Sequence, residues 1–392
     1  MGRGREGSLA IGPLLRDQRV RSVVYQVIFC LLAAAAIAFL IHEASINLAR
    51  RHLATGFGFW NVTAGFDISQ TLIDYSSSTS TYGRAFWVGL LNTLLVAAIG
   101  IVLTTLLGFT IGIARLSSNW LVARLANGYV QLIRNIPLLL QLLFWYNAVL
   151  KALPDFRDSL RLPGGGFLNN RGLFLPAPQL GGSGHLVFLA LLAGIAGAAG
   201  LAALARRGRL SGGTAAGLGL ALVLGLPAAV YLASGASVTL VYPEMSRFNL
   251  RGGTEILPEF VALVLGLVIY TAAFIAEVVR AGISSVPRGQ TEAALALGLS
   301  RAATLRLVIV PQAMRVIIPP LTNQYLNLTK NSSLAVAIGY PDLVQIFTGT
   351  VLNQTSQAVE IVAITMAVYL AISLVTSFLM NIYNARMTPR ER

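Results

Sequence analysis

The sequence predicts an all-α membrane protein that crosses the bilayer about eight times, and two properties of the chain lead to this prediction. The first is composition: of 392 residues, 55% are hydrophobic and only 11% are charged. Soluble domains carry roughly 25% charged residues, so this chain suits a lipid environment. The second is the recurrence of apolar runs of about 20 residues, the length that a helix needs to cross the hydrocarbon core.

Eight apolar segments fit this prediction, and in chain order they are 23–41, 86–114, 127–150, 186–205, 214–233, 258–279, 312–336 and 358–383. The first is too long for the apolar part of a cleavable signal and lacks a clear small-residue cleavage site, so we expect it to remain as an anchor. The fourth and fifth are rich in Ala, Gly and Leu and predict a hairpin. The seventh is broken by two prolines and several polar residues, so it is too polar to face lipid.

The distribution of charge predicts the orientation. With the N-terminus inside, the cytoplasmic segments hold nineteen arginines against five acidic residues, whereas the outer segments hold nine basic against ten acidic residues. Cytoplasmic segments of membrane proteins carry an excess of Lys and Arg. The sequence therefore predicts cytoplasmic termini and outer loops at 42–85, 151–185 and 234–257, of which the second is rich in Gly, Pro and Asn turn residues.

Several classes of function are not expected. The net charge of +14 is almost all arginine, with only two lysines, Lys151 and Lys330, and no basic patch interleaved with aromatics, so nucleic acid is not a predicted partner. Neither lysine follows a glycine, so the chain has no phosphate-binding G-x-x-x-x-G-K loop. No Ser/His/Asp arrangement is present, so we expect no catalytic residues, no cofactor and no enzyme activity. The histidines are too dispersed for a metal site: His42, His52 and His185.

The segment 284–311, between the sixth and seventh spans, is a cytoplasmic loop with helix-forming composition. Pro287 suits the first turn of a helix capped by one of the two preceding serines. Gly298 suits a left-handed helix stop. Ser300 suits the cap of a second helix running to Pro311. The sequence therefore predicts two short helices that meet at a tight glycine turn.

The same loop carries a family resemblance. The spacing of Glu292-Ala293-Ala294, Gly298 and an aliphatic run ending at Pro311 resembles the coupling loop of ABC importer permeases. The resemblance implies that this loop docks on a separate ATPase subunit. Two small alanines permit close approach, and the glutamate offers a carboxylate to cationic groups. The alternative is an ordinary amphipathic cytoplasmic loop.

Other stretches resemble the polar amino-acid permeases within that family. They are 92–93, 114–117, 134–142, 277–283, 330–336 and 338–343. The resemblance covers 86–150 and 258–383, which implies the five-span core of a type I ABC importer transmembrane domain. The first span and the 186–233 hairpin are additions that resemble one permease subunit of the general L-amino acid transport system.

The resemblance implies three parts along the chain. Residues 1–85 would hold the cytoplasmic N-terminus, the first span and an outer loop. Residues 86–383 would form the permease domain, with an insertion at about 151–257 and the coupling loop at 284–311. Residues 384–392 would be a cytoplasmic tail.

The seventh span also supplies candidate pathway residues. A lysine deep in a span costs roughly 2.5–3.5 kcal/mol on insertion scales, so Lys330 should face a polar partner or cavity. The polar residues around it place several groups on one side of a helix, a stripe that predicts either a translocation path or hydrogen bonds between helices. The alternative role for Lys330 is a structural ion pair with Asp342 or Glu360. The candidate pathway residues are Asn323, Gln324, Asn327, Lys330, Asn331, Ser332 and Ser333.

Two further interpretations concern helix geometry. Glu277 and Arg280, three residues apart at the inner end of the sixth span, predict a local ion pair that anchors the coupling loop. Pro137, Pro319 and Pro320 predict kinks.

The expected function is the permease subunit of an ATP-driven importer of L-amino acids, in the inner membrane of a bacterium. The resemblance implies an ATPase dimer, a second permease subunit, most simply a different chain, and a periplasmic binding protein as partners, with lipid around them. The alternatives are an ABC permease for another small polar solute and a secondary transporter driven by an ion gradient. A secondary transporter would have no reason to carry the coupling loop.

Overall fold

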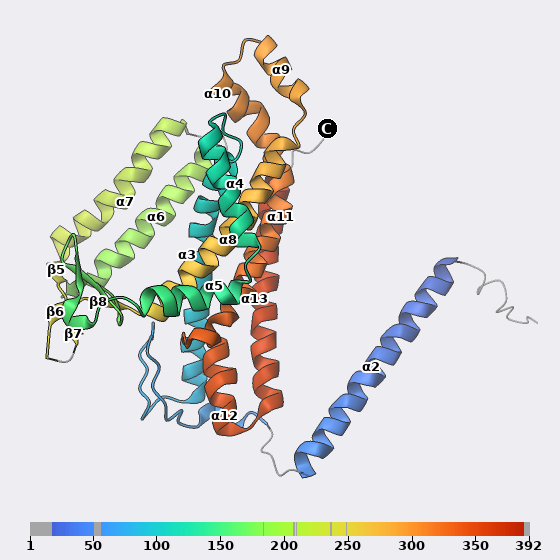
Figure 1. The fold of residues 1–392 in the computed structure, drawn as a ribbon, viewed down its shortest axis with the longest axis vertical. Coiled ribbons are helices and arrows are strands. Elements are labelled where there is room, and N and C mark those ends of the chain that lie inside the picture. Colours follow the sequence, from blue (N-terminus) through green and yellow to red (C-terminus); the bar gives the residue numbers. More distant parts are fainter. Residues whose placement is uncertain are drawn as a thin grey trace, which may run out of the picture.

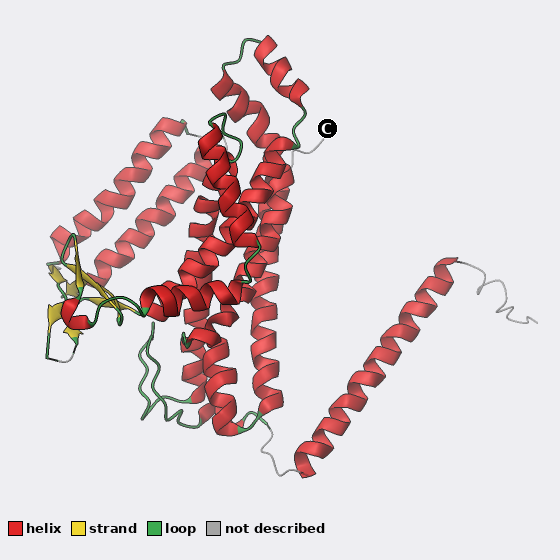
Figure 2. Ribbon diagram, in the orientation of Figure 1, coloured by secondary structure: helices red, strands yellow, loops and turns green. Residues whose placement is uncertain are grey.

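The computed structural model describes residues 18–50, 56–182, 184–206, 208, 210–235, 237–247 and 249–387. The expectations for the segment before Gln18, for His52, for the arginines at 207 and 209 and for the last five residues of the tail lie outside these residues. Within them the protein is mostly helical, with long helices side by side and small strands at one corner (Figures 1 and 2).

The number of predicted spans is confirmed within the described residues. Seven helices are long and apolar enough to cross a membrane, and one bent pair brings the number to eight. The seven lie in α2 (Gln18–Arg50), α3 (Tyr82–Ala114), α6 (Gly184–Arg206), α7 (Gly212–Ser234), α8 (Pro258–Ser284), α11 (Val310–Asn331) and α13 (Ala358–Met387). The apolar part of α2 contributes no buried residue, and Figure 1 shows α2 apart from the other helices.

The third span is bent near Pro137, as the sequence predicts, but the bend is sharp enough to divide it into two helices. It consists of α4 (Trp120–Arg134), then α5 (Leu138–Leu143) with a π-helical continuation, η2 (Phe144–Leu150), and the two halves meet at 102°. Pro137 lies at the break, and the residue before a proline is disfavoured in helical geometry. The amide of Gln141 donates to the carbonyls of Ile133 and Ile136 at 3.0 and 2.9 Å, so the break leaves neither carbonyl unpaired.

Small residues set the contacts between the core helices. A Cβ at Gly108 or Gly112 of α3 would lie 2.6 Å from Ile275 or 2.7 Å from Val279 of α8. Gly282, near the end of α8, meets Ile317 of α11 in the same way. Membrane helices associate through such small residues because lipid gives no hydrophobic drive between helices. The result is a tightly packed centre in which α8 lies between α3 and α11.

The shorter helical segments connect these long helices. They are η1 (Gly58–Asn61), η3 (Phe156–Asp158), α9 (Arg288–Ala296), α10 (Arg301–Thr304), η4 (Leu305–Ile309), η5 (Ser332–Ile338), η6 (Gln345–Val351) and α12 (Leu352–Thr355).

The second and third outer loops contain strands that the sequence analysis did not predict. Three antiparallel sheets form, in the orders β1-β2-β3-β8, β4-β5 and β6-β7. The strands are β1 (Leu160–Leu162), β2 (Gly166–Asn169), β3 (Gly172–Leu175), β4 (Ala177–Gly181), β5 (Ser237–Val241), β6 (Glu244–Met245), β7 (Leu250–Arg251) and β8 (Thr254–Ile256). The turn residues do mark turns, but these join short strands instead of forming an irregular loop.

The β4–β5 sheet closes the base of the α6–α7 hairpin. Gly181, at the end of β4, pairs directly with Ser237, at the start of β5. Figure 1 shows α6 and α7 against each other, to one side of the core helices. We propose that the hairpin is an addition that the transport cycle does not need.

This proposal predicts the outcome of a deletion. Replacing 182–236 by Asn-Gly would join β4 and β5 through a two-residue turn, which suits antiparallel strands. It removes two spans, so the later spans keep their direction. We expect the shortened chain to assemble and to support uptake of the same order as the full chain, measured in proteoliposomes. Assembly without uptake would place the hairpin in the mechanism and contradict the proposed division.

Candidate functional site

The coupling-loop segment projects from one end of the helix bundle (Figure 1). Gly298 has φ +80°, the left-handed region that favours glycine. Its N–H donates to the Leu295 carbonyl at 2.9 Å, and the N–H of Leu299 donates to the Ala294 carbonyl at 3.2 Å. These two bonds form a Schellman turn, so the predicted glycine stop is confirmed.

Only one of the two predicted caps of the loop helices is confirmed. Ser300 caps α10, because its hydroxyl accepts from the N–H of Ala303 at 3.2 Å. The serines before Pro287 do not cap α9: Ser284 is the last residue of α8, and the Ser285 hydroxyl donates to the Gly282 carbonyl at 2.8 Å. Pro287 itself precedes α9, with no side-chain cap. The serines therefore end the preceding span instead of starting the loop helix.

The surface of the loop exposes three of the four predicted coupling residues, with Ala294 the exception, and it also exposes apolar side chains. Glu292, Ala293 and Gly298 are exposed, whereas Ala294 is 4% exposed. Leu297, next to the glycine, is 83% exposed. The loop therefore presents both polar and apolar side chains to its surroundings.

The sequence predicted that the second helix of the loop ends at Pro311, and this prediction is wrong. α10, the π-helical η4, α11 and η5 form one helical segment, Arg301–Ile338. Pro311 is the second residue of α11 and comes directly after the π-helical η4, so the helical segment continues through the proline. The second helix of the loop and the seventh span are therefore parts of one continuous helix.

The candidate pathway residues lie on the exposed side of that span. Asn323, Asn327 and Lys330 are exposed, with Gln324 and Asn331 half-buried beside them. The opposite side is buried in the core, through Ile317, Ile318, Leu321, Tyr325 and Leu328. One helix thus has an apolar face toward its own chain and a polar face away from it.

Ser332 and Ser333 lie differently from the other pathway candidates. Ser332 is 0% exposed, and its hydroxyl donates to the Thr329 carbonyl at 2.7 Å. The half-buried Ser333 donates to the carbonyl of Lys330 at 2.7 Å. Both belong to η5, and only Ser332 is buried. Ser332 therefore differs from the expectation, and we omit it from the stripe.

The two suggested carboxylate partners of Lys330 are used elsewhere. Asp342 is buried and accepts hydrogen bonds from the Gln345 N–H at 2.8 Å and the Tyr369 hydroxyl at 3.2 Å. Burial raises the pKa of the Asp342 carboxyl to about 7. Glu360 accepts from the N–H of Gly56 at 2.5 Å. Within the described part of the chain, no ion pair involves Lys330.

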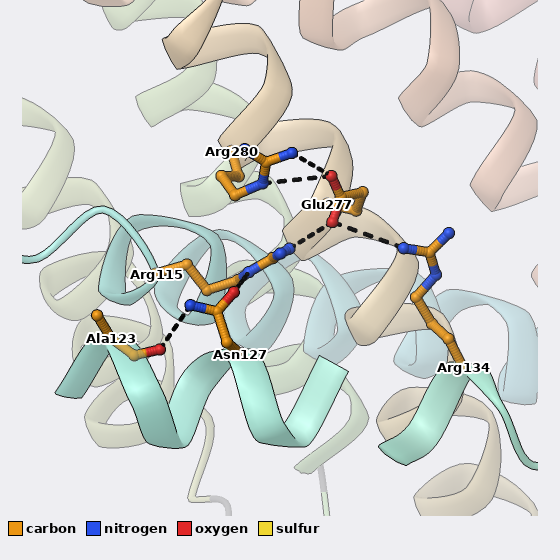
Figure 3. A network of polar contacts seen from close by, with 6 residues as sticks. All are labelled: Arg115, Ala123, Asn127, Arg134, Glu277 and Arg280. Atoms are coloured by element: carbon orange, nitrogen blue, oxygen red, sulfur yellow. Dashed lines mark hydrogen bonds and ion pairs between the residues drawn. The ribbon is translucent and has the colours of Figure 1, made fainter. Parts of the chain in front are cut away.

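A charged cluster lies just before the coupling loop (Figure 3). Both oxygens of the Glu277 carboxylate are used: Arg280 lies 2.5 Å from one, and Arg115 and Arg134 lie 2.6 and 3.5 Å from the other. Asn127 accepts from Nε of Arg115 at 2.7 Å. The predicted Glu277–Arg280 pair is confirmed, and it joins α8 to the ends of α3 and α4.

The sequence analysis missed the two other arginines of this cluster. Arg115 follows the last residue of α3, and Arg134 is the last residue of α4. Both stood in stretches that resembled the family, but nothing in the spacing linked them to Glu277. The available signal was the scarcity of acids, because Glu277 is the only acidic residue between 260 and 291.

The chain is similar in sequence to permease proteins of known transport systems. Residues 252–389 match the family model described as "Binding-protein-dependent transport system inner membrane component". The chain is 50% identical over 99% of its length, and 98% of the relative's, to the putative amino-acid ABC transporter permease protein YhdX of Escherichia coli. It belongs to the amino-acid ABC transporter permease family. It is also 49% identical to the general L-amino acid transport system permease protein AapQ of Rhizobium johnstonii, over 96% of this chain and 94% of the relative.

The chain is also 42% identical to the glutamate/glutamine/aspartate/asparagine transport system permease protein BztB of Rhodobacter capsulatus, over 97% of this chain and 96% of the relative. As an ABC permease, the chain is a multi-span membrane component of a transporter complex. The region of the family model contains α8, the coupling loop, α11 and α13. The 284–311 loop and the polar side of α11 therefore lie within the segment that matches the family model, whereas Arg115 and Arg134 lie before it.

Proposed function

We propose that this permease carries L-amino acids, acidic and polar ones included, through the inner membrane in a complex whose ATPase docks on the 284–311 loop. Both termini are cytoplasmic in this proposal, because the loop and the excess of arginines then lie on the same side. The observation that carries it is the continuous helix from the projecting loop to the polar stripe of α11.

The mechanism follows from that continuity. The ATPase would hold Glu292, Ala293 and Leu297, and its closure on ATP would displace α9 and α10. The Schellman turn at Gly298 keeps the two short helices at a fixed angle, so the displacement reaches α11 as a rigid movement. The polar face of α11 then changes its position relative to the facing subunit, which opens or closes the path.

The polar stripe supports a second permease subunit as a partner. Asn323, Asn327 and Lys330 point away from their own chain, and hydrocarbon would penalise an exposed amide or ammonium group. A second permease whose corresponding helix faces α11 would enclose a polar space between them. We infer that this space is the translocation path.

The substrate class is supported by the chemistry of that stripe. Every amino acid carries an α-carboxylate, and a lysine ammonium in a partly dry cavity binds a carboxylate through a charge-assisted hydrogen bond. The side-chain amides of Asn323 and Asn327 could both donate and accept, which suits polar side chains. Relatives that transport glutamate, glutamine, aspartate and asparagine by name agree with this class. A secreted binding protein would deliver the substrate on the outer side.

Photo-crosslinking tests the docking step. A photoreactive amino acid at Leu297, in the complex assembled in the cell, should form an adduct with the ATPase chain, detected by mass spectrometry. The matched control is Leu374 on α13, which is also strongly exposed, at 61%, but lies within a span. We expect lipid or permease adducts there. An ATPase adduct from neither position, or equally from both, would contradict docking at the loop.

A further inference from the structure

The coupling loop contains a pocket of about 500 Å³ in the angle between α9 and the helix formed by α10 and η4. Most of its lining is apolar, and Leu295, Leu305 and Ile309 contribute to it. Binding pockets in proteins usually have volumes of about 300–1,000 Å³. The pocket is therefore large enough to receive several side chains of a partner.

The two helices that line the pocket run in opposite directions. Nε2 of Gln312, just beyond the end of η4, donates to Oε1 of Gln290 at 3.3 Å, so α9 begins beside the end of η4. At its other end, α9 leads through the Gly298 turn into the start of α10. The first residue of α9 and the first residue of α10 therefore lie at opposite ends of the pocket.

Both of these residues are arginines. Arg288 begins α9 and Arg301 begins α10, and both are exposed and line the pocket. In the part of the chain that the structure describes, neither arginine forms an ion pair. Neither helix has an acidic residue in its first turn. Each end of the pocket therefore carries a positive charge that no neighbouring carboxylate neutralises.

The rest of the loop does not balance this charge. Residues 284–311 hold three arginines, the third being Arg306, against one acidic residue, Glu292, which leaves a net charge of +2. Glu292 lies four residues after Arg288, on the same side of α9, but no ion pair joins the two. Interfaces pair a positive surface with a negative one, so we expect the surface that meets this loop to be acidic.

The position of the pocket favours the ATPase as its occupant. The pocket lies in the segment that projects from the end of the helix bundle (Figure 1). Leu295 of its lining is three residues after Glu292 and two before Leu297, where we propose that the ATPase docks. Leu295 and Leu305 are 42% and 51% exposed. A small anion would satisfy an arginine and leave these apolar side chains uncovered, whereas a protein segment can cover both.

We propose that the ATPase subunit inserts a segment into this pocket, with apolar side chains between the two helices and an acidic side chain toward each arginine. The inference rests on the proposed docking at the 284–311 loop and deepens it, because it specifies the chemistry of the ATPase surface. The coupling loop then also receives a part of the ATPase, and this contact holds α9 and α10 together from both ends of the pocket.

A photoreactive amino acid at Leu305, in the complex assembled in the cell, tests the contact directly. It should form an adduct with an ATPase peptide that contains acidic residues, identified by mass spectrometry. The matched control is Leu307 of the same helix, which is 64% exposed and does not line the pocket. Two residues along a helix turn the side chain to nearly the opposite side. We therefore expect no ATPase adduct from Leu307.

Binding of the purified ATPase to the permease complex in nanodiscs measures the contribution of charge. We expect Arg288→Gln and Arg301→Gln together to weaken binding about tenfold at low salt, since each exposed ion pair contributes a small factor. The difference should shrink at high salt, which screens exposed charges. Both arginines are exposed and without ion pairs, so the variant should fold. Arg306→Gln removes the same charge outside the pocket and should weaken binding less than either single variant.

Three results would overturn the proposal. One is a Leu305 adduct with lipid or a permease chain only, and another is an ATPase adduct in equal yield from Leu307. The third is wild-type affinity in the double arginine variant. Any of these, combined with an ATPase adduct at Leu297, would remove the pocket contact and leave docking at the loop standing. Absence of an ATPase adduct at Leu297 as well would contradict the proposed function itself.

Discussion

Replacing Gly298 by valine should abolish the coupling of ATP hydrolysis to uptake while the complex still assembles. No atom lies within 4 Å of a Cβ at this position, so packing does not oppose a larger side chain. The obstacle is the backbone: φ is +80°, and a left-handed conformation costs roughly 1–2 kcal/mol for an ordinary residue and more for a β-branched one. The turn would open, and the angle between α9 and α10 would be lost.

The measurement is ATPase activity and amino-acid uptake on the same proteoliposomes. We expect uptake by Gly298→Val to fall at least about tenfold, the factor that 1.4 kcal/mol represents, with ATPase activity lost or no longer responsive to substrate. Gly289→Val is the control, because this glycine of α9 also has open space around it but no positive φ. Gly298→Asn should restore most uptake, since asparagine tolerates the left-handed region. Wild-type uptake in Gly298→Val would refute the coupling assignment.

Replacing Lys330 by methionine should lower uptake selectively. Methionine keeps much of the length of the side chain and removes its charge, so the amino acid would lose a charge-assisted hydrogen bond worth about 1.5–3 kcal/mol. We expect a loss of about ten- to a hundredfold for glutamate, with smaller losses for glutamine and for a cationic amino acid. Glutamate carries a second carboxylate that the same ammonium would also attract.

Reconstituted Lys330→Met complex, assayed with glutamate, glutamine and arginine, provides the test. Lys151→Met is the natural control, because it removes the only other lysine of the chain, in the segment after η2. Lys330→Arg should keep more activity for glutamate than Lys330→Met does. Unchanged rates for all three substrates would leave the α11 stripe as an interface between helices, and loss of the assembled complex would indicate a structural role. Equal loss for all three with the complex intact would indicate that the ammonium meets only the α-carboxylate that the three substrates share.

Local sequence signals predicted those parts of the fold that depend on local chemistry. The spans follow from apolar length, the Gly298 turn from the freedom of glycine at positive φ, and the Ser300 cap from its hydroxyl. The predicted stop at Pro311 was wrong, because the helix continues through the proline directly after the π-helical turn η4. A proline can mark either the end of one helix or the beginning of the next, and the packing around it decides between the two.

The parts that depend on distant contacts could not be predicted. The strand pairs in the outer loops join residues up to about 80 positions apart, as for Leu173 and Ile256, and short strands give a weak periodic signal. The Glu277 cluster brings together the ends of α3 and α4 with α8, which no spacing records. The bend near Pro137 was expected, but its size of 102° depends on the Gln141 side chain and the surrounding helices.

The most direct test of the account is the energy source of uptake. The permease is reconstituted with its partner permease, the ATPase and the binding protein, and labelled glutamate uptake is followed with ATP or with an imposed proton gradient alone. We predict uptake that requires ATP on the ATPase side and the binding protein on the other side, and that is unaffected by collapse of the gradient. Uptake driven by the gradient without ATP would contradict the proposal that this chain is the translocating subunit of an ATP-driven importer.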